Sequence, residues 1–112
     1  MRGKFAEKQA RKFLQSRGLS FITKNFKCQY GEIDLIMGDK NELVFVEVRM
    51  RSSRLYGDAA ETVDKTKLTK LINSSEYYIQ RNYADKQVPN SRMDLVAING
   101  TKFEWIHNIQ LN

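Results

Sequence analysis

Two acidic residues interrupt apolar runs of the sequence at positions where burial would be unfavourable. Asp34 lies within Glu32-Ile33-Asp34-Leu35-Ile36-Met37, and Glu47 lies within Leu43-Val44-Phe45-Val46-Glu47-Val48-Arg49. In a strand, side chains two positions apart share a face, so Glu32 accompanies Asp34 and Arg49 accompanies Glu47. A buried carboxylate is strongly disfavoured unless a cation, hydrogen bonds or a metal compensates it. Both strands therefore predict a charged site rather than plain packing.

The spacing of the two acids favours a shared metal ion. Gly38-Asp39-Lys40-Asn41 separates the two runs as a turn, and a hairpin there would bring Asp34 and Glu47 together. Such oxygen ligands suit Mg²⁺ or Mn²⁺, which take one or two carboxylates together with water and substrate phosphate. The ion would lower the pKa of a bound water and stabilise charge on a phosphodiester. Two alternatives stay open: a solvated Asp34 on an edge strand, and an ion pair of Glu47 with Arg49 that needs no metal.

The elements around these acids predict one domain over residues 1–112 in the order α-β-β-β-α-β-β. Helical spacing of apolar residues predicts a first helix from Gly3 to Arg17, stopped by Gly18, with a basic outer surface and Glu7 at the border of its apolar stripe. Three strands joined by short turns should form an antiparallel meander, and a helix capped by Asp64 should cross over to the fourth strand. The remaining predicted elements are strands 19–28, 32–37, 42–50, 93–98 and 102–109, and a second helix ending near residue 83.

Composition narrows the class of protein and partner. The 112 residues include 19 Lys and Arg against 13 Asp and Glu, a net charge of +6, which favours a polyanionic partner, with simple solubility as the alternative. Cys28 is the only cysteine, which excludes an intramolecular disulfide and a cysteine-rich zinc site. Neither a signal-peptide pattern nor a membrane-spanning apolar run is visible, so we expect a cytoplasmic location and no membrane partner.

These motifs resemble a known family. The segment Gly31 to Ile36, followed by Val44 to Arg51 and Tyr56-Gly57, closely resembles the YraN-like family of small bacterial proteins. That family is similar to Holliday junction resolvases and to the wider PD-(D/E)xK nuclease superfamily. The resemblance implies a restriction-endonuclease-like α/β core with a mixed central sheet flanked by helices, a nucleic acid partner, DNA in particular, and a homodimer. The likeness also covers Ala6-Glu7, Ala10, Asn25, Lys67, Arg92-Met93-Asp94 and Ile106-His107.

The resemblance also implies roles for individual residues. Asp34 matches the aspartate of the superfamily motif, Glu47 its second acidic ligand, and Glu7 the first-helix glutamate that often completes the metal site. Arg49 stands at the place of the motif lysine, which is the main departure from the pattern. Arginine cannot act as a base, although its planar fork can hold a phosphate. With arginine in place of the motif lysine, phosphate binding is still expected, but rapid cleavage is less expected.

Further cations could contact the nucleic acid. Arg51, Arg54 and Tyr56 follow the third strand as a loop of cations and an aromatic ring that could track a sugar-phosphate backbone, with a solvated loop as the alternative. Lys67, in the first turn of the second helix, could contact a phosphate or lie on the surface. Asp94 is expected to cap or to pair with Arg92, and Glu32 to be a structural acid.

Three functions from different classes fit the sequence. The first is a metal-dependent endonuclease acting on phosphodiesters, in branched or structured DNA for example. The second is a non-catalytic DNA- or RNA-binding module of the same fold, and the third is a protein-interaction scaffold. No helix-turn-helix, zinc finger or RNA-binding signature is present, so recognition of backbone or shape is expected rather than base reading.

Overall fold

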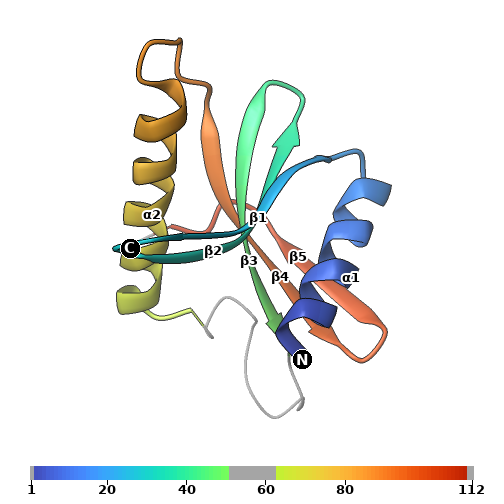
Figure 1. The fold of residues 1–112 in the computed structure, drawn as a ribbon. Helices are drawn as coiled ribbons and strands as arrows, with labels where there is room; N and C mark the ends of the chain where they lie inside the picture. Colours follow the sequence, from blue (N-terminus) through green and yellow to red (C-terminus); the bar gives the residue numbers. More distant parts are fainter. Residues whose placement is uncertain (1, 51–62, 111–112) are drawn as a thin grey trace.

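The computed structural model describes residues 2–50 and 63–110. Within them the chain forms two helices and five strands in the predicted order (Figure 1). The elements are α1 (Arg2–Ser16), β1 (Ser20–Cys28), β2 (Gly31–Asp39), β3 (Glu42–Met50), α2 (Lys65–Tyr83), β4 (Ser91–Asn99) and β5 (Lys102–Ile106).

The strands form one mixed sheet in chain order, from β1 to β5. Neighbouring strands are antiparallel except β3 and β4, which are parallel and are connected by way of α2. The predicted meander and the predicted crossover are therefore both confirmed. Figure 1 shows α1 on one face of the sheet and α2 on the other, so the protein has three layers.

Each face of the sheet carries its own apolar core. On the α1 face, Ala6 and Ala10 are almost fully buried, and their small side chains let the helix lie close to the strands. On the α2 face, Leu68, Leu71 and Tyr78 supply the helix side of the core. Burial on both faces explains why the central strands are apolar almost throughout. The strand residues of the α1 core are Leu35, Met37, Val44, Val46, Val96 and Ile98, and those of the α2 core are Ile33, Ile36, Leu43, Phe45 and Met93.

The helix ends follow the predicted signals. Gly18 adopts a positive φ of 98° directly after α1, a conformation that glycine adopts without steric penalty. Asp64 caps α2, and its Oδ1 accepts a hydrogen bond from the backbone nitrogen of Lys67 at 2.8 Å. Neither helix in the described ranges has the length and apolar character that crossing a membrane requires.

The fifth strand is shorter than predicted. It ends at Ile106 rather than at residue 109, because Asn108 takes a positive φ of 55° that breaks the extended backbone. The backbone nitrogen of Asn108 donates to Asp94 Oδ1 at 2.8 Å, and that of Ile109 donates to Met93 O at 2.8 Å. These two hydrogen bonds hold the segment after β5 against β4.

Arg92 and Asp94 form a buried polar network that confirms the predicted pairing. Arg92 Nε lies 3.1 Å from both carboxylate oxygens of Asp94, and its terminal nitrogens donate to Glu42 at 2.6 Å and Asp39 at 3.1 Å. Asp94 is fully buried and also accepts a hydrogen bond from Trp105 Nε1 at 2.9 Å. The network thus joins β4 to the end of the β2–β3 hairpin and to β5.

Aromatic side chains attach α1 to β5. The Phe13 ring stacks on Phe103 at a centroid distance of 4.7 Å and meets the Trp105 ring edge-on at 6.2 Å. Trp105 also contacts His107, which is exposed beyond the end of β5. Aromatic pairs in such arrangements add stability beyond their buried area.

The Asp94 network yields a stability prediction. Replacing Asp94 with Ala removes the acceptor of Arg92 Nε, of the Trp105 indole and of the Asn108 amide, so we expect the free energy of unfolding to fall by about 3–5 kcal/mol. Urea unfolding followed by circular dichroism would measure it. Asp85→Ala is the matched control, because Asp85 is exposed and its loss should change stability by less than about 0.5 kcal/mol. Equal stability of the two variants would contradict the prediction.

Candidate acidic site

Strands β2 and β3 separate at Asp34. Their pairing ends at Leu35 opposite Val46, although β2 continues along β1 and β3 continues along β4. Beyond this pair, the backbone nitrogen of Val48 donates to Asp34 Oδ2 at 2.8 Å. The side chain of Asp34 thus supplies the acceptor for β3 where the backbone pairing has ended. Figure 1 shows β2 turning toward α2 while β3 runs toward the N-terminal end of α1.

The same position interrupts the alternation of β2. Leu35 and Met37 belong to the core beneath α1, whereas Ile33 and Ile36 belong to the core beneath α2. Strict alternation would place Ile33 on the same face as Leu35. Asp34 therefore lies where the strand changes the face that it buries. Because β2 lies between β1 and β3, Asp34 does not stand on an edge strand, contrary to one of the alternatives.

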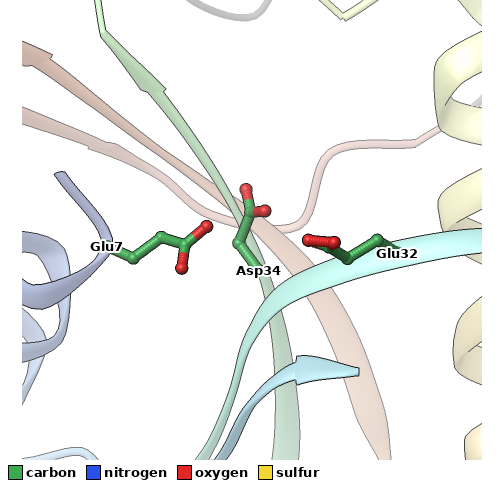
Figure 2. A group of neighbouring side chains, drawn as sticks. All are labelled: Glu7, Glu32 and Asp34. Carbon is green, nitrogen blue, oxygen red and sulfur yellow. The ribbon is translucent and has the colours of Figure 1, made fainter. Parts of the chain in front are cut away.

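Three carboxylates gather at this fork. Glu7 from α1 and Glu32 and Asp34 from β2 each place a carboxylate oxygen within 4.8 Å of the other two. Figure 2 shows Glu7 and Glu32 reaching toward Asp34 from opposite sides. Asn25 Nδ2 donates to Glu7 Oε1 at 2.7 Å and so orients this carboxylate. Asn25 does so from a left-handed backbone conformation, with φ of 51°, which asparagine tolerates better than most residues.

Glu47 meets Asp34 from β3. The side chain of Glu47 is only 5% exposed, and a hydrogen bond joins its carboxyl group to that of Asp34. Two cations lie near its Oε2 atom: Arg49 Nε at 3.2 Å and Lys67 Nζ at 3.6 Å. The ion pair of Glu47 with Arg49 that the sequence suggested is thus present, and α2 adds a second cation. Arg49 Nε is buried without the alignment of a hydrogen bond, so its contact with Glu47 is electrostatic.

This concentration of acids raises carboxyl pKa values. Burial raises the pKa of Asp34 to about 7; the charge of Glu47 and the hydrogen bond to it add to this, and the bond from Val48 opposes it. Burial also raises the pKa of Glu7, where the hydrogen bond from Asn25 opposes the rise and the charge of Asp34 contributes to it. Asp34 therefore holds a proton at a higher pH than an ordinary aspartate does.

An open cavity makes the acids accessible. It has a volume of about 370 Å³ and lies between α1 and the end of β3, where Glu7, Asp34, Glu47 and Arg49 all line it. The groups in this cavity that could coordinate a cation are carboxylate oxygens, the ligands that Mg²⁺ and Mn²⁺ prefer. Together with the raised pKa of Asp34, this donor set fits such an ion, with room left for water or a phosphate oxygen.

The structure brings most of the predicted site residues together. Glu7, Asp34, Glu47 and Arg49 line one cavity, and Lys67 reaches it through Glu47. Because the backbone nitrogen of Lys67 is already bonded to its helix cap, only its side chain is available for a phosphate. The predicted contacts Arg51, Arg54 and Tyr56 lie outside the described residues.

Two residues of the cluster had smaller roles in the sequence-based prediction. Glu32, interpreted there as a structural acid, lies beside Glu7 and Asp34, and its place two positions before Asp34 was the available signal. It also lies 4.0 Å from the Lys27 ammonium. Asn25, noted there only for the family likeness, holds Glu7, and no local pattern indicated this contact.

The fold and the site define a mixed α/β protein with carboxylates gathered at a fork in its sheet, an arrangement compatible with an α/β nuclease-like fold. A sequence model described as "Uncharacterised protein family UPF0102" matches residues 6–98. The chain belongs to this family, the YraN family that its motifs indicated. The match contains every residue that was predicted for the site.

Relatives in several bacteria are similar to the chain over almost its whole length. A UPF0102 protein of Photorhabdus laumondii is 44% identical over 106 residues, which are 95% of this chain and 84% of the relative. A UPF0102 protein of Neisseria meningitidis is 44% identical over 108 residues, covering 96% and 92%. A third, from Haemophilus influenzae, is 45% identical over 106 residues, covering 91% and 87%.

The raised pKa of Asp34 predicts a pH-dependent stability. Its ordinary value is 3.8 and the folded value is about 7, so folding takes up a proton between these pH values. The stability that this proton contributes is complete below pH 4 and is lost as the pH rises through about 7. Asp34→Asn is neutral throughout, and its advantage over the wild type should grow from pH 5 to pH 8 by up to about 2.6 kcal/mol, since about two pKa units lie between pH 5 and the folded value. Urea unfolding at both pH values in EDTA tests this, with the exposed Asp85→Asn as control. An advantage that does not change with pH would refute it.

Proposed function

We propose that this chain is a nucleic-acid-binding protein with a restriction-endonuclease-like, PD-(D/E)xK core that hydrolyses phosphodiester bonds with the help of Mg²⁺ or Mn²⁺. One observation carries the proposal: carboxylates from α1, β2 and β3 converge at the fork of the sheet and line one open cavity. Structural carboxylates are normally compensated by cations or donors, whereas burial and neighbouring carboxylates raise the pKa of Asp34 and of Glu7. The excess of basic residues in the chain supports a polyanionic substrate.

Each acid has a distinct part in this proposal. Asp34 and Glu47 would hold the metal, and Glu7 would support it directly or through a water. A bound divalent ion supplies a lowered pKa for a coordinated water and neutralises charge on a phosphate. Asp34 keeps its position through the bond from Val48, and Glu7 keeps its position through Asn25. The acids are therefore fixed before any ligand arrives.

The neighbouring cations would hold the substrate. Arg49 is permanently charged and lines the cavity, so its guanidinium would hold a phosphate oxygen there. Lys67 adds a second cation at the same carboxylate. Both are needed for a simple electrostatic reason, because a group of acids on its own repels a phosphate.

A second candidate is a non-catalytic nucleic-acid-binding module of the same fold. It is favoured by the contacts of Glu47, whose charge is already compensated by Arg49 and Lys67 without a metal. The arginine at the place of the motif lysine points the same way, since it cannot exchange a proton. In this case binding persists without metal and survives Glu47→Ala.

A cleavage assay tests the leading proposal. With Mn²⁺, the wild type should cut at least one labelled DNA among single-stranded, duplex, flap and four-way substrates. Changing a residue that merely orients a metal ligand commonly costs 10- to 100-fold, so Asp34→Ala and Glu47→Gln should each lower the rate by about 100-fold or more. Asp85→Ala, an exposed acid far along the chain, is the matched control and should retain the full rate.

Calorimetry separates metal binding from catalysis. Titration of Mn²⁺ into the wild type, with and without a short duplex, should give a binding heat that is lost in Glu47→Ala. If no substrate is cut above the level of Asp34→Ala, the nuclease proposal is wrong. Binding that persists in EDTA and in Glu47→Ala would then favour the non-catalytic module, and the absence of nucleic acid binding at physiological salt would favour a protein-interaction scaffold.

A further inference from the structure

A second cavity adjoins the acidic site and is strongly basic. It has a volume of about 270 Å³ and lies between α1 and β1. Glu7 lines both cavities, so they are neighbours along the side of α1. We call it the basic groove, and its lining residues are Lys4, Glu7, Lys8, Arg11, Lys24, Asn25 and Leu35.

The helix periodicity of α1 creates this groove. Lys4, Lys8 and Arg11 follow one another at spacings of four and three residues, so they lie on one face of the helix. Four residues rise about 6 Å along the axis, which spaces the charges so that more than one phosphate can be contacted. Lys24 adds a cation from β1, and the Arg11 guanidinium is held 3.6 Å above the Phe21 ring.

No acid among the described residues pairs with the lysines of the groove. In the part of the chain that the structure describes, Lys4, Lys8 and Lys24 make no ion pair, whereas Arg92 has three acidic partners. Glu7 is the only acid among the described lining residues, and it is engaged by Asn25 and the other carboxylates. Like charges around a concave surface repel one another and concentrate a positive potential. An anionic ligand would relieve this repulsion.

We propose that the basic groove binds the sugar-phosphate backbone of one nucleic acid strand and leads it past Glu7 to the acidic site. The inference rests on the proposed function, because it assigns a path to the substrate of that same site. The described lining offers cations and an amide but no aromatic ring on which a base could stack, so contact with the backbone is favoured over contact with bases. Binding should accordingly be independent of sequence and strongly dependent on salt.

Two double variants with equal charge test the groove. Lys8→Gln with Lys24→Gln removes two of its cations, and Lys40→Gln with Lys86→Gln removes two exposed lysines that do not line it. Fluorescence anisotropy with a labelled 20-nucleotide single strand in EDTA, over a range of NaCl concentrations, measures binding without cleavage. The groove variant should bind about tenfold more weakly or worse, and its slope of log affinity against log salt should be shallower by about 1.4, or about 0.7 for each phosphate that is no longer neutralised. The control should keep the wild-type slope.

The outcomes distinguish this proposal from the one on which it rests. Circular dichroism melting curves establish that both double variants are folded, as expected for four exposed lysines. If the wild type binds the strand and the two variants weaken binding equally, the groove proposal is overturned while nucleic acid binding stands. If the wild type binds no nucleic acid, both proposals fail. A selective loss in the groove variant supports the path even where Mn²⁺ produces no cleavage.

Discussion

The hydrogen bond from the Val48 amide to the Asp34 carboxylate is the contact on which the site depends. Two strands cannot part inside a sheet without leaving backbone groups unpaired, and an unpaired buried amide is strongly disfavoured. Asp34 supplies an acceptor for one such amide where β2 leaves β3. The fork it permits admits Glu7 from α1, and the cavity opens there. A backbone feature of the sheet thus determines where the acids collect.

Two aspartates in the same sheet illustrate opposite solutions for a carboxylate in the interior. Asp94 receives donors from Arg92, Trp105 and Asn108, and it stabilises the contact of β4 with β5 and with the segment after β5. Asp34 receives a single amide and otherwise faces acids, and its burial together with the charge of Glu47 raises its pKa to about 7. Burial of the apolar cores on both faces of the sheet offsets the free-energy cost of holding Asp34 among other acids. Local conflicts of this kind are characteristic of functional positions, where stability is given up for chemistry.

The sequence predicted the order of the elements and most of their positions because its local signals agree with the fold. Turn residues bracket the strands, and Gly18 and Asp64 mark helix ends. The approach of Asp34 to Glu47 followed from strand alternation and a short turn. The contact between Asn25 and Glu7 could not be predicted, since it depends on how α1 docks and on a left-handed residue. The early end of β5 was missed for a similar reason, because the bond from Asn108 to Asp94 spans fourteen residues.

The position of Trp105 makes its fluorescence a probe of one part of the molecule. It is the only tryptophan of the chain, its indole nitrogen is bonded to Asp94, and its ring meets Phe13 from α1. Its fluorescence therefore comes from a single place, the joint where α1, β4 and β5 meet. The same helix carries Glu7 and two lysines of the basic groove, Lys4 and Lys8, and any displacement of α1 changes the surroundings of this ring. The intrinsic fluorescence of Trp105 therefore reports how α1 packs against the sheet, without an added label.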